Sequence, residues 1–195
     1  DVLFDALLGS RIELGDPRLM LLSRVAFEIV KGGLHTTTAT IEFLDTELKQ
    51  SGHSIPHLRE SLGAAGQMLA ERQSAITLTV DRDAVRFSSV TDVQVLAGLH
   101  VARLFATPPS DRIPEELREL RGTAKYDDCA RFVLSAFQRI GGTREALFHS
   151  MARLLAHQDP SFSFCARLIH SSYDFTLLEP SEGLNGTLFR NLIRA

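Results

Sequence analysis

Tryptophan is absent from this sequence of 195 residues, and lysine is scarce. Only Lys31, Lys49 and Lys125 are lysines, so almost all of the basic side chains are arginines. The 21 basic and 24 acidic residues leave a formal net charge of −3. A sequence-independent nucleic-acid binder normally has a basic surface, so the composition argues against that class of protein. Net charge does not report how charge is distributed, and a local basic patch is compatible with it.

Cysteine and long apolar runs are also scarce. The two cysteines, Cys129 and Cys165, lie within apolar helical patterns, which predicts two buried thiols rather than a disulfide framework. We therefore expect a cytoplasmic or other reducing intracellular compartment. No stretch approaches the roughly 20 apolar residues that span a bilayer, and we expect no membrane association. The chain begins at Asp1 rather than methionine, so the lack of a leader sequence carries little weight.

Recognisable catalytic, metal and nucleotide motifs are missing as well. The sequence has no Gly-x-Ser-x-Gly turn, no His-Glu-x-x-His pair and no glycine-rich phosphate loop. His53 and His57 are four residues apart, but Pro56 lies between them and no third ligand is near, so we predict no metal site. We predict no catalytic residue and no cofactor. An enzymatic activity assembled from residues far apart in the sequence is left without support.

Apolar residues make up 44% of the chain and recur at helical spacing through most of it. We predict a mainly α fold of about eight helices with one central β-hairpin and a C-terminal helical hairpin. Proline, threonine or aspartate precedes several of these helices, and glycine or proline follows them. The expected helices run over residues 2–8, 19–31, 36–52 with a start among Thr36, Thr37 and Thr38, 56–72, 92–105, 115–121, 126–140 and 143–157.

The central hairpin is the clearest strand signal. Residues 76–80 and 84–88 alternate with period two around the turn Asp81-Arg82-Asp83. A lone two-stranded hairpin is marginally stable in water, so its apolar face must pack on helices. Two helices followed by a hairpin is the order found in a winged helix, but helical domains also cover a core in this way. The winged-helix arrangement is left open by the sequence.

The stretch Thr107-Pro108-Pro109-Ser110 is the clearest linker. We predict a helical domain with the hairpin over residues 1–106 and a helical subdomain over residues 107–195, with one continuous domain as the alternative. In the second part, Gly141-Gly142 separates two predicted helices of about 15 residues, which is typical of an antiparallel helical hairpin.

Apolar clusters at both ends of the chain suggest a function. Short segments of this kind cannot bury themselves, so they either fold back or dock on another subunit. The first hypothesis is a non-catalytic protein-protein interaction or assembly subunit, acting in a homo-oligomer or a larger complex. The interface candidates are Phe4, Leu7, Leu188, Phe189 and Ile193.

Two alternatives belong to other classes. A winged-helix-like regulatory protein would bind nucleic acid through arginines that a dimer could bring together, and the candidates are Arg59, Arg72, Arg82 and Arg86. Nucleic acid is not favoured, because the exposed side chains of residues 56–72 mix acids with bases and the hairpin turn is net negative. A helical ligand sensor or enzyme would instead hold an anion at a helix start. The anion-binding candidates are His35, Thr36, Thr37 and Thr38.

Overall fold

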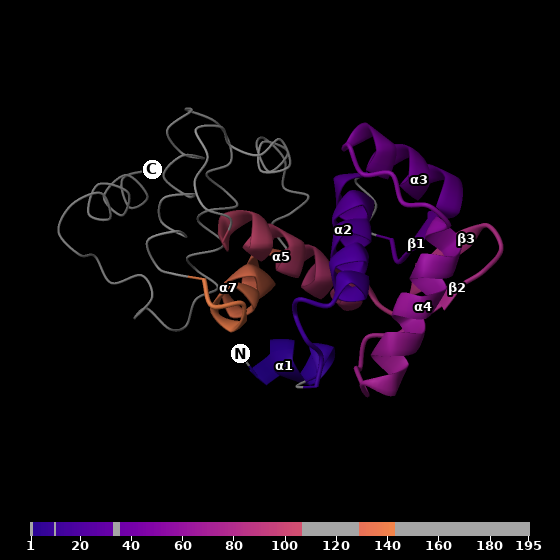
Figure 1. Ribbon diagram of the computed structural model, residues 1–195. Helices are drawn as coiled ribbons and strands as arrows, with labels where there is room; N and C mark the ends of the chain where they lie inside the picture. The colour runs from indigo at the N-terminus through magenta and orange to yellow at the C-terminus, as the bar shows by residue number, and fades with distance from the viewer. Residues whose placement is uncertain (1, 10, 33–35, 107–128, 143–195) are drawn as a thin grey trace, which may run out of the picture. The chain divides into compact units, whose positions relative to one another are not determined.

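The computed structural model describes residues 2–9, 11–32, 36–106 and 129–142 (Figure 1). Within them lie six helices and three strands. The helices are α1 (Val2–Leu8), α2 (Pro17–Lys31), α3 (Ile41–Gln50), α4 (Leu58–Glu71), α5 (Val90–Ala106) and α7 (Ala130–Arg139). The strands are β1 (Thr38–Thr40), β2 (Leu78–Val80) and β3 (Ala84–Phe87). The mainly α prediction is confirmed, with six helices in these residues against about eight predicted for the chain.

Contacts divide the chain into two compact units, Asp1–His100 and Val101–Ala195. The division falls within α5, whereas the predicted linker at 107–110 lies outside the described residues, so the predicted limit at residue 106 stays a prediction. The first unit holds the sheet and helices α1 to α4, and the second holds α7. The second helix of the predicted C-terminal hairpin, at 143–157, also lies outside the described residues.

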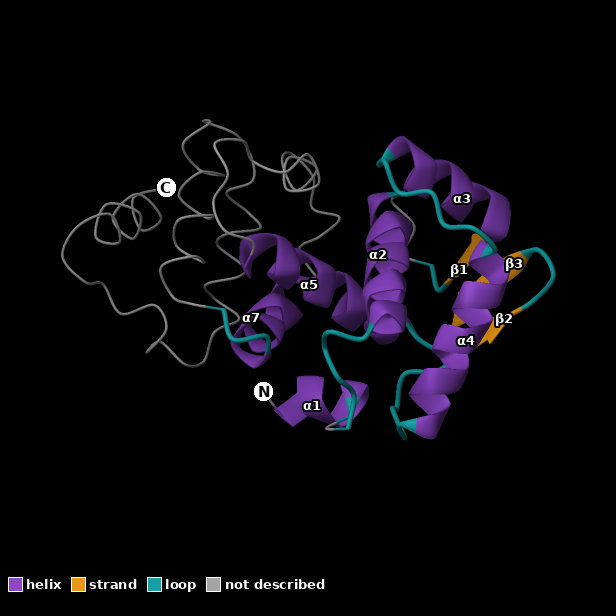
Figure 2. Cartoon of the chain, viewed as in Figure 1, coloured by secondary structure: helices purple, strands orange, loops and turns teal. Residues whose placement is uncertain are grey.

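The sheet has three antiparallel strands in the order β1-β3-β2 (Figure 2). The hairpin predicted at 76–88 is confirmed, since Leu78 pairs with Phe87 and Val80 with Val85. The third strand was not predicted. The helix start expected among Thr36, Thr37 and Thr38 is wrong, because Thr38–Thr40 pairs with β3 and the helix begins only at Ile41.

Three helices of the first unit pack on one another and on the sheet. Helix α2 contacts both α3 and α4, and α4 contacts β2. Each contributes an apolar stripe at helical spacing, as the sequence predicts. Side chains in this core that are fully buried include Leu22, Val25, Ile29, Leu44, Leu48, Leu62, Leu69 and Val85. Gly66 lets β2 approach α4, because a Cβ at this position would lie 3.4 Å from the carbonyl oxygen of Leu78. The close neighbour of Gly66 is therefore the strand β2.

The apolar helix α5 begins with a capping box. The Ser89 backbone N–H donates to Asp92 Oδ2 at 3.2 Å, and the Asp92 N–H donates to Ser89 Oγ at 3.1 Å. The N-cap of α5 is thus Ser89, just before the helix begins at Val90. Although α5 is strongly apolar, none of the helices in the described ranges is long and apolar enough to cross a membrane.

In the second unit, α7 agrees with the helix predicted over 126–140 in the part that is described. Its end has Gly141 at φ +75°, and the Gly142 N–H donates back to the Phe137 carbonyl at 3.0 Å. This is the glycine-terminated helix end that the Gly-Gly pair predicts. Cys129 is a buried free thiol, as expected, while Cys165 lies outside the described residues.

Candidate binding pocket

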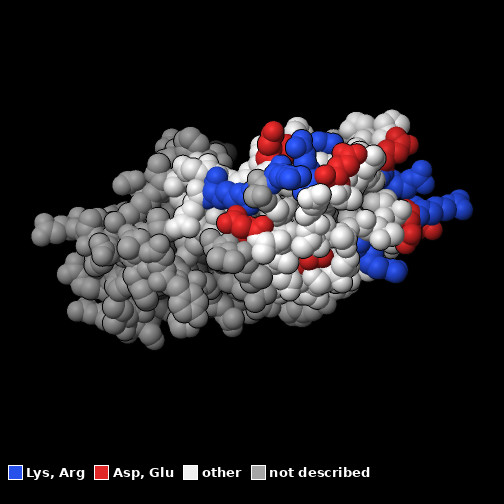
Figure 3. Space-filling view, turned by 90° about the horizontal axis from the view of Figure 1, so that it is seen from below, with Lys and Arg blue, Asp and Glu red and all other residues white. Residues whose placement is uncertain are grey.

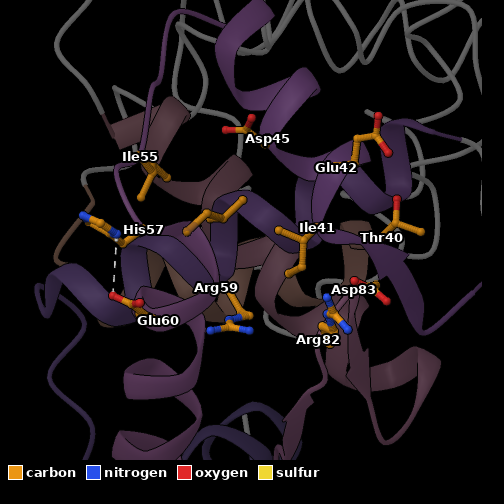
Figure 4. A pocket seen from close by; sticks show the side chains of 11 residues that line it. Thr40, Ile41, Glu42, Asp45, Ile55, His57, Arg59, Glu60, Arg82 and Asp83 are labelled. Atoms are coloured by element: carbon orange, nitrogen blue, oxygen red, sulfur yellow. Dashed lines mark ion pairs between the residues drawn. The ribbon is translucent and has the colours of Figure 1, made fainter.

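An open pocket of about 650 Å³ lies on the surface of the first unit (Figure 4). Three segments that are far apart in the sequence line it: the start of α3, the connection leading into α4, and the β2–β3 turn. The lining residues are Thr40, Ile41, Glu42, Asp45, Ile55, His57, Leu58, Arg59, Glu60, Arg82 and Asp83. The pocket thus combines an apolar lining with charges of both signs.

Main-chain bonds hold the start of α3 against the hairpin turn. The Ile41 N–H donates to the Asp83 carbonyl at 2.9 Å, which continues the β1–β3 pairing by one more bond. The Asp81 N–H donates to the Ala84 carbonyl at 2.8 Å and closes the turn. The Thr40 hydroxyl accepts from the Phe43 N–H at 3.1 Å and caps α3. Two sides of the pocket are therefore fixed by backbone geometry.

The third side is formed by the start of α4. His57 precedes this helix with φ +54°, a left-handed conformation, and its side chain makes no cap hydrogen bond. A non-glycine residue in this conformation costs about 1–2 kcal/mol, and such residues gather at functional sites. The turn leaves Leu58 buried, while Arg59 and Glu60 are exposed at the pocket. The sequence indicated a helix start at Pro56 but not this conformation.

Four charges in the pocket make no ion pair with another described residue: Arg59, Arg82, Glu42 and Asp83. The other two acids have cationic neighbours, since Asp45 pairs with Lys49 and Glu60 lies 3.7 Å from His57. Figure 4 shows Arg59 and Arg82 on the same side of the pocket, coming from α4 and from the hairpin turn. The charges left for a ligand are two positive and two negative.

The four arginines predicted for nucleic-acid binding do not form one patch within a single chain. Arg59 and Arg82 line the same pocket, but Arg72 follows the far end of α4, roughly 20 Å along the helix. Arg86 is exposed on β3 beside Thr38 and Thr79, and its buried neighbours Val85 and Phe87 point to the other face. Figure 3 shows basic and acidic side chains interspersed on the described part of the face it presents.

The interface candidates at the N-terminus are mostly turned inward. Phe4 is 1% exposed, and Leu7 is half-buried. The Leu7 carbonyl accepts from the Ala75 N–H at 3.0 Å and from the Ser74 hydroxyl at 3.0 Å, which joins α1 to the segment before β2. Phe4 is therefore not exposed to a partner. The remaining interface candidates, Leu188, Phe189 and Ile193, lie outside the described residues.

The anion-binding candidates do not lie at a helix start, where the prediction placed them. Thr36 Oγ1 accepts from the Thr38 N–H at 3.0 Å, and the Thr37 carbonyl accepts from the Phe87 N–H at 2.8 Å. These groups serve the edge of the sheet rather than a helix N-terminus. His35 lies outside the described residues.

A second polar cluster lies between α2 and the end of α3. Glu28 is 1% exposed, and its Oε1 accepts from the Ser51 hydroxyl at 3.0 Å. Lys31 lies 3.6 Å from Glu28 and 3.5 Å from Glu47, and so connects the two helices. Burial raises the pKa of the Glu28 carboxyl, and the charge of Lys31 and the Ser51 hydrogen bond offset only part of that effect.

The substitution Glu28→Gln should change how stability depends on pH. Because the folded chain binds the Glu28 proton more tightly than the unfolded chain, the free energy of unfolding falls as pH rises from the ordinary glutamate pKa through the raised one. Glutamine does not titrate but still accepts from Ser51. Urea denaturation should therefore show the variant gaining stability relative to wild type between pH 4 and pH 7. If the difference in unfolding free energy between the variant and wild type were the same at pH 4 and pH 7, the raised pKa of Glu28 would be contradicted.

No group of three or more histidine, cysteine, aspartate or glutamate side chains in the described ranges could hold a metal ion. The pocket residues that the sequence did not single out, such as Glu42 and Asp83, carry no local signal, because folding alone places them together. Comparison with known proteins gives no match to a family model, to a curated protein or to a solved structure.

Proposed function

We propose that this chain is a non-catalytic interaction protein whose first unit is a winged-helix module that binds a protein partner at the pocket. The order α2-β1-α3-α4-β2-β3, with β3 between β1 and β2, supports the winged-helix arrangement. In this arrangement α4 takes the position of the recognition helix, and the β2–β3 hairpin is the wing. The pocket opens between them, where a winged helix meets its ligand.

The observation that carries the proposal is the balance of charge at this surface. Arg59 and Arg82 face outward beside Glu42 and Asp83, and residues 1–100 hold nine basic against thirteen acidic side chains, a formal net charge of −4. A nucleic-acid backbone offers only negative charge and would meet repulsion from the carboxylates. A polypeptide offers side chains of both charges, which can pair with the four pocket charges. It also offers apolar side chains, which can contact Ile41, Ile55 and Leu58 in the pocket lining.

Charge reversal at the pocket tests the proposal. The immobilised full chain is compared with Arg59→Glu combined with Arg82→Glu, and with the control Arg72→Glu at the other end of the same helix. We expect wild type and the control to capture the same proteins from the source cells. The double variant should capture these proteins about tenfold less, or not at all. Equal capture by all three proteins would contradict the pocket as the binding surface.

Nucleic-acid binding is the second candidate, because Arg59 and Arg82 converge from the recognition-helix and wing positions. The same three proteins are titrated into fluorescent duplex DNA at low salt. Under our proposal, the double variant should bind the DNA no more weakly than wild type and the control do. Salt-sensitive binding by wild type and the control, lost in the double variant, would replace the protein partner with DNA. Self-assembly through the C-terminal candidates stays a prediction, which light scattering of the full chain can test.

A further inference from the structure

The imidazole of His53 is held between two groups of opposite hydrogen-bonding character. Its Nδ1 lies 2.7 Å from the Ser51 carbonyl oxygen, and its Nε2 lies 3.0 Å from Nη1 of Arg24 on α2. A carbonyl oxygen only accepts and a guanidinium only donates. The ring must therefore carry its proton on Nδ1 and accept from Arg24 through Nε2. This requires a neutral imidazole in the Nδ1–H form.

A second proton on this ring removes the contact. Nε2 would then carry a hydrogen directed at the N–H groups of Arg24, and two positive charges would face each other. We propose that the His53–Arg24 contact positions the connection 51–57 against α2 while the ring is neutral, and that a second proton on the ring releases this connection. Ile55 and His57 of the pocket belong to this connection. An effect of this release on partner binding rests on the proposed function, whereas the release of the connection itself does not.

The carboxylate of Glu28 partly compensates the positive charge of Arg24 while it is ionised. Helix α2 also carries Lys31, and the last turn of α3 carries Glu47, which pairs with Lys31. Ser51 joins the two contacts, since its carbonyl accepts from His53 and its hydroxyl donates to Glu28. Glu28 is close enough to interact electrostatically with Arg24. As acid protonates Glu28, it removes negative charge near Arg24 and leaves the repulsion between Arg24 and His53 less compensated.

Nuclear magnetic resonance of the full chain tests the proposal without any partner. Long-range ¹H–¹⁵N spectra at pH 7.5 should show His53 as the Nδ1–H tautomer. Between pH 7.5 and pH 5.5, the backbone amides of Ser51 and Gly52 and the methyl groups of Ile55 should shift together with the His53 ring. An Nε2–H tautomer at pH 7.5 would overturn the inference.

Substitutions at three residues separate the contact from a general response to acid. His53→Gln keeps an oxygen that can accept from Arg24 but carries no ring proton, so the Ile55 methyl shifts should lose the part of their pH dependence that follows the His53 ring. His57→Asn and Glu28→Gln remove the neighbouring groups that also exchange protons, and both should leave the response of Gly52 to the His53 ring intact. A response of Gly52 and Ile55 to pH that is as large in His53→Gln combined with Glu28→Gln as in wild type would overturn the inference. Failure of the capture experiment would leave these spectra unaffected, so the two proposals can fail separately.

Discussion

Phe4→Ala is expected to lower the free energy of unfolding by about 3–5 kcal/mol, although the sequence places Phe4 in an apolar arm that suggests an interface. Its side chain is 1% exposed, so truncation leaves a cavity rather than a smaller contact surface. Helix α1 cannot move away freely, because the Leu7 carbonyl is bonded to Ala75 and Ser74. Urea denaturation followed by circular dichroism measures the loss.

Met20→Ala is the matched control for this prediction. Met20 is 48% exposed on α2, so its truncation should change the free energy of unfolding by less than about 0.5 kcal/mol. Light scattering on the Phe4 variant distinguishes a core position from an interface position. A variant of unchanged stability that dissociates from an oligomer would contradict the inward position and restore the interface hypothesis.

The hairpin could be predicted because its signal is local. Residues 76–88 alternate over enough positions to indicate which side chains share a face, and the turn is rich in aspartate. Strand β1 has only three residues, and its partner β3 lies more than 40 residues later in the chain. No periodicity exists over Thr38–Thr40, and the three threonines before Ala39 suggest a helix cap. Pairing with β3 decides the structure there, and only the last threonine, Thr40, caps a helix.

The sequence identified only some of the residues that line the pocket. Arg59 and Arg82 line the same pocket, whereas Arg72 follows the far end of α4 and Arg86 lies on β3. The separation depends on the direction of α4 and on which face of β3 points outward, and both are set by packing rather than by the residues themselves. The neutral tautomer of His53 depends in the same way on Arg24, which lies 29 positions earlier. Charge patterns can suggest a binding function, but the fold decides which charges act together.

The contact of α4 with strand β2 leads to a second large effect, at Gly66. A Cβ there would lie 3.4 Å from the Leu78 carbonyl oxygen and 3.5 Å from the Leu78 Cβ and Cδ2. Gly66→Leu adds three further carbons that must displace β2, which should lower the free energy of unfolding by about 1–3 kcal/mol. Gly63 lies in the same helix with nothing within 4 Å of its Cβ position. Gly63→Leu should therefore raise the free energy of unfolding by roughly 0.5–1 kcal/mol, because leucine is a better helix former than glycine.

Comparing the same substitution at two positions of one helix removes the contribution of helix propensity, so the difference in unfolding free energy reports the packing of β2 on α4. We expect the two variants to change stability in opposite directions. If Gly66→Leu were as stabilising as Gly63→Leu, then β2 would not lie against α4, and the β2–β3 hairpin would not be held beside this helix. The pocket would then lose the packing that places the Arg82 turn beside Arg59, and the proposed binding surface would fail with it.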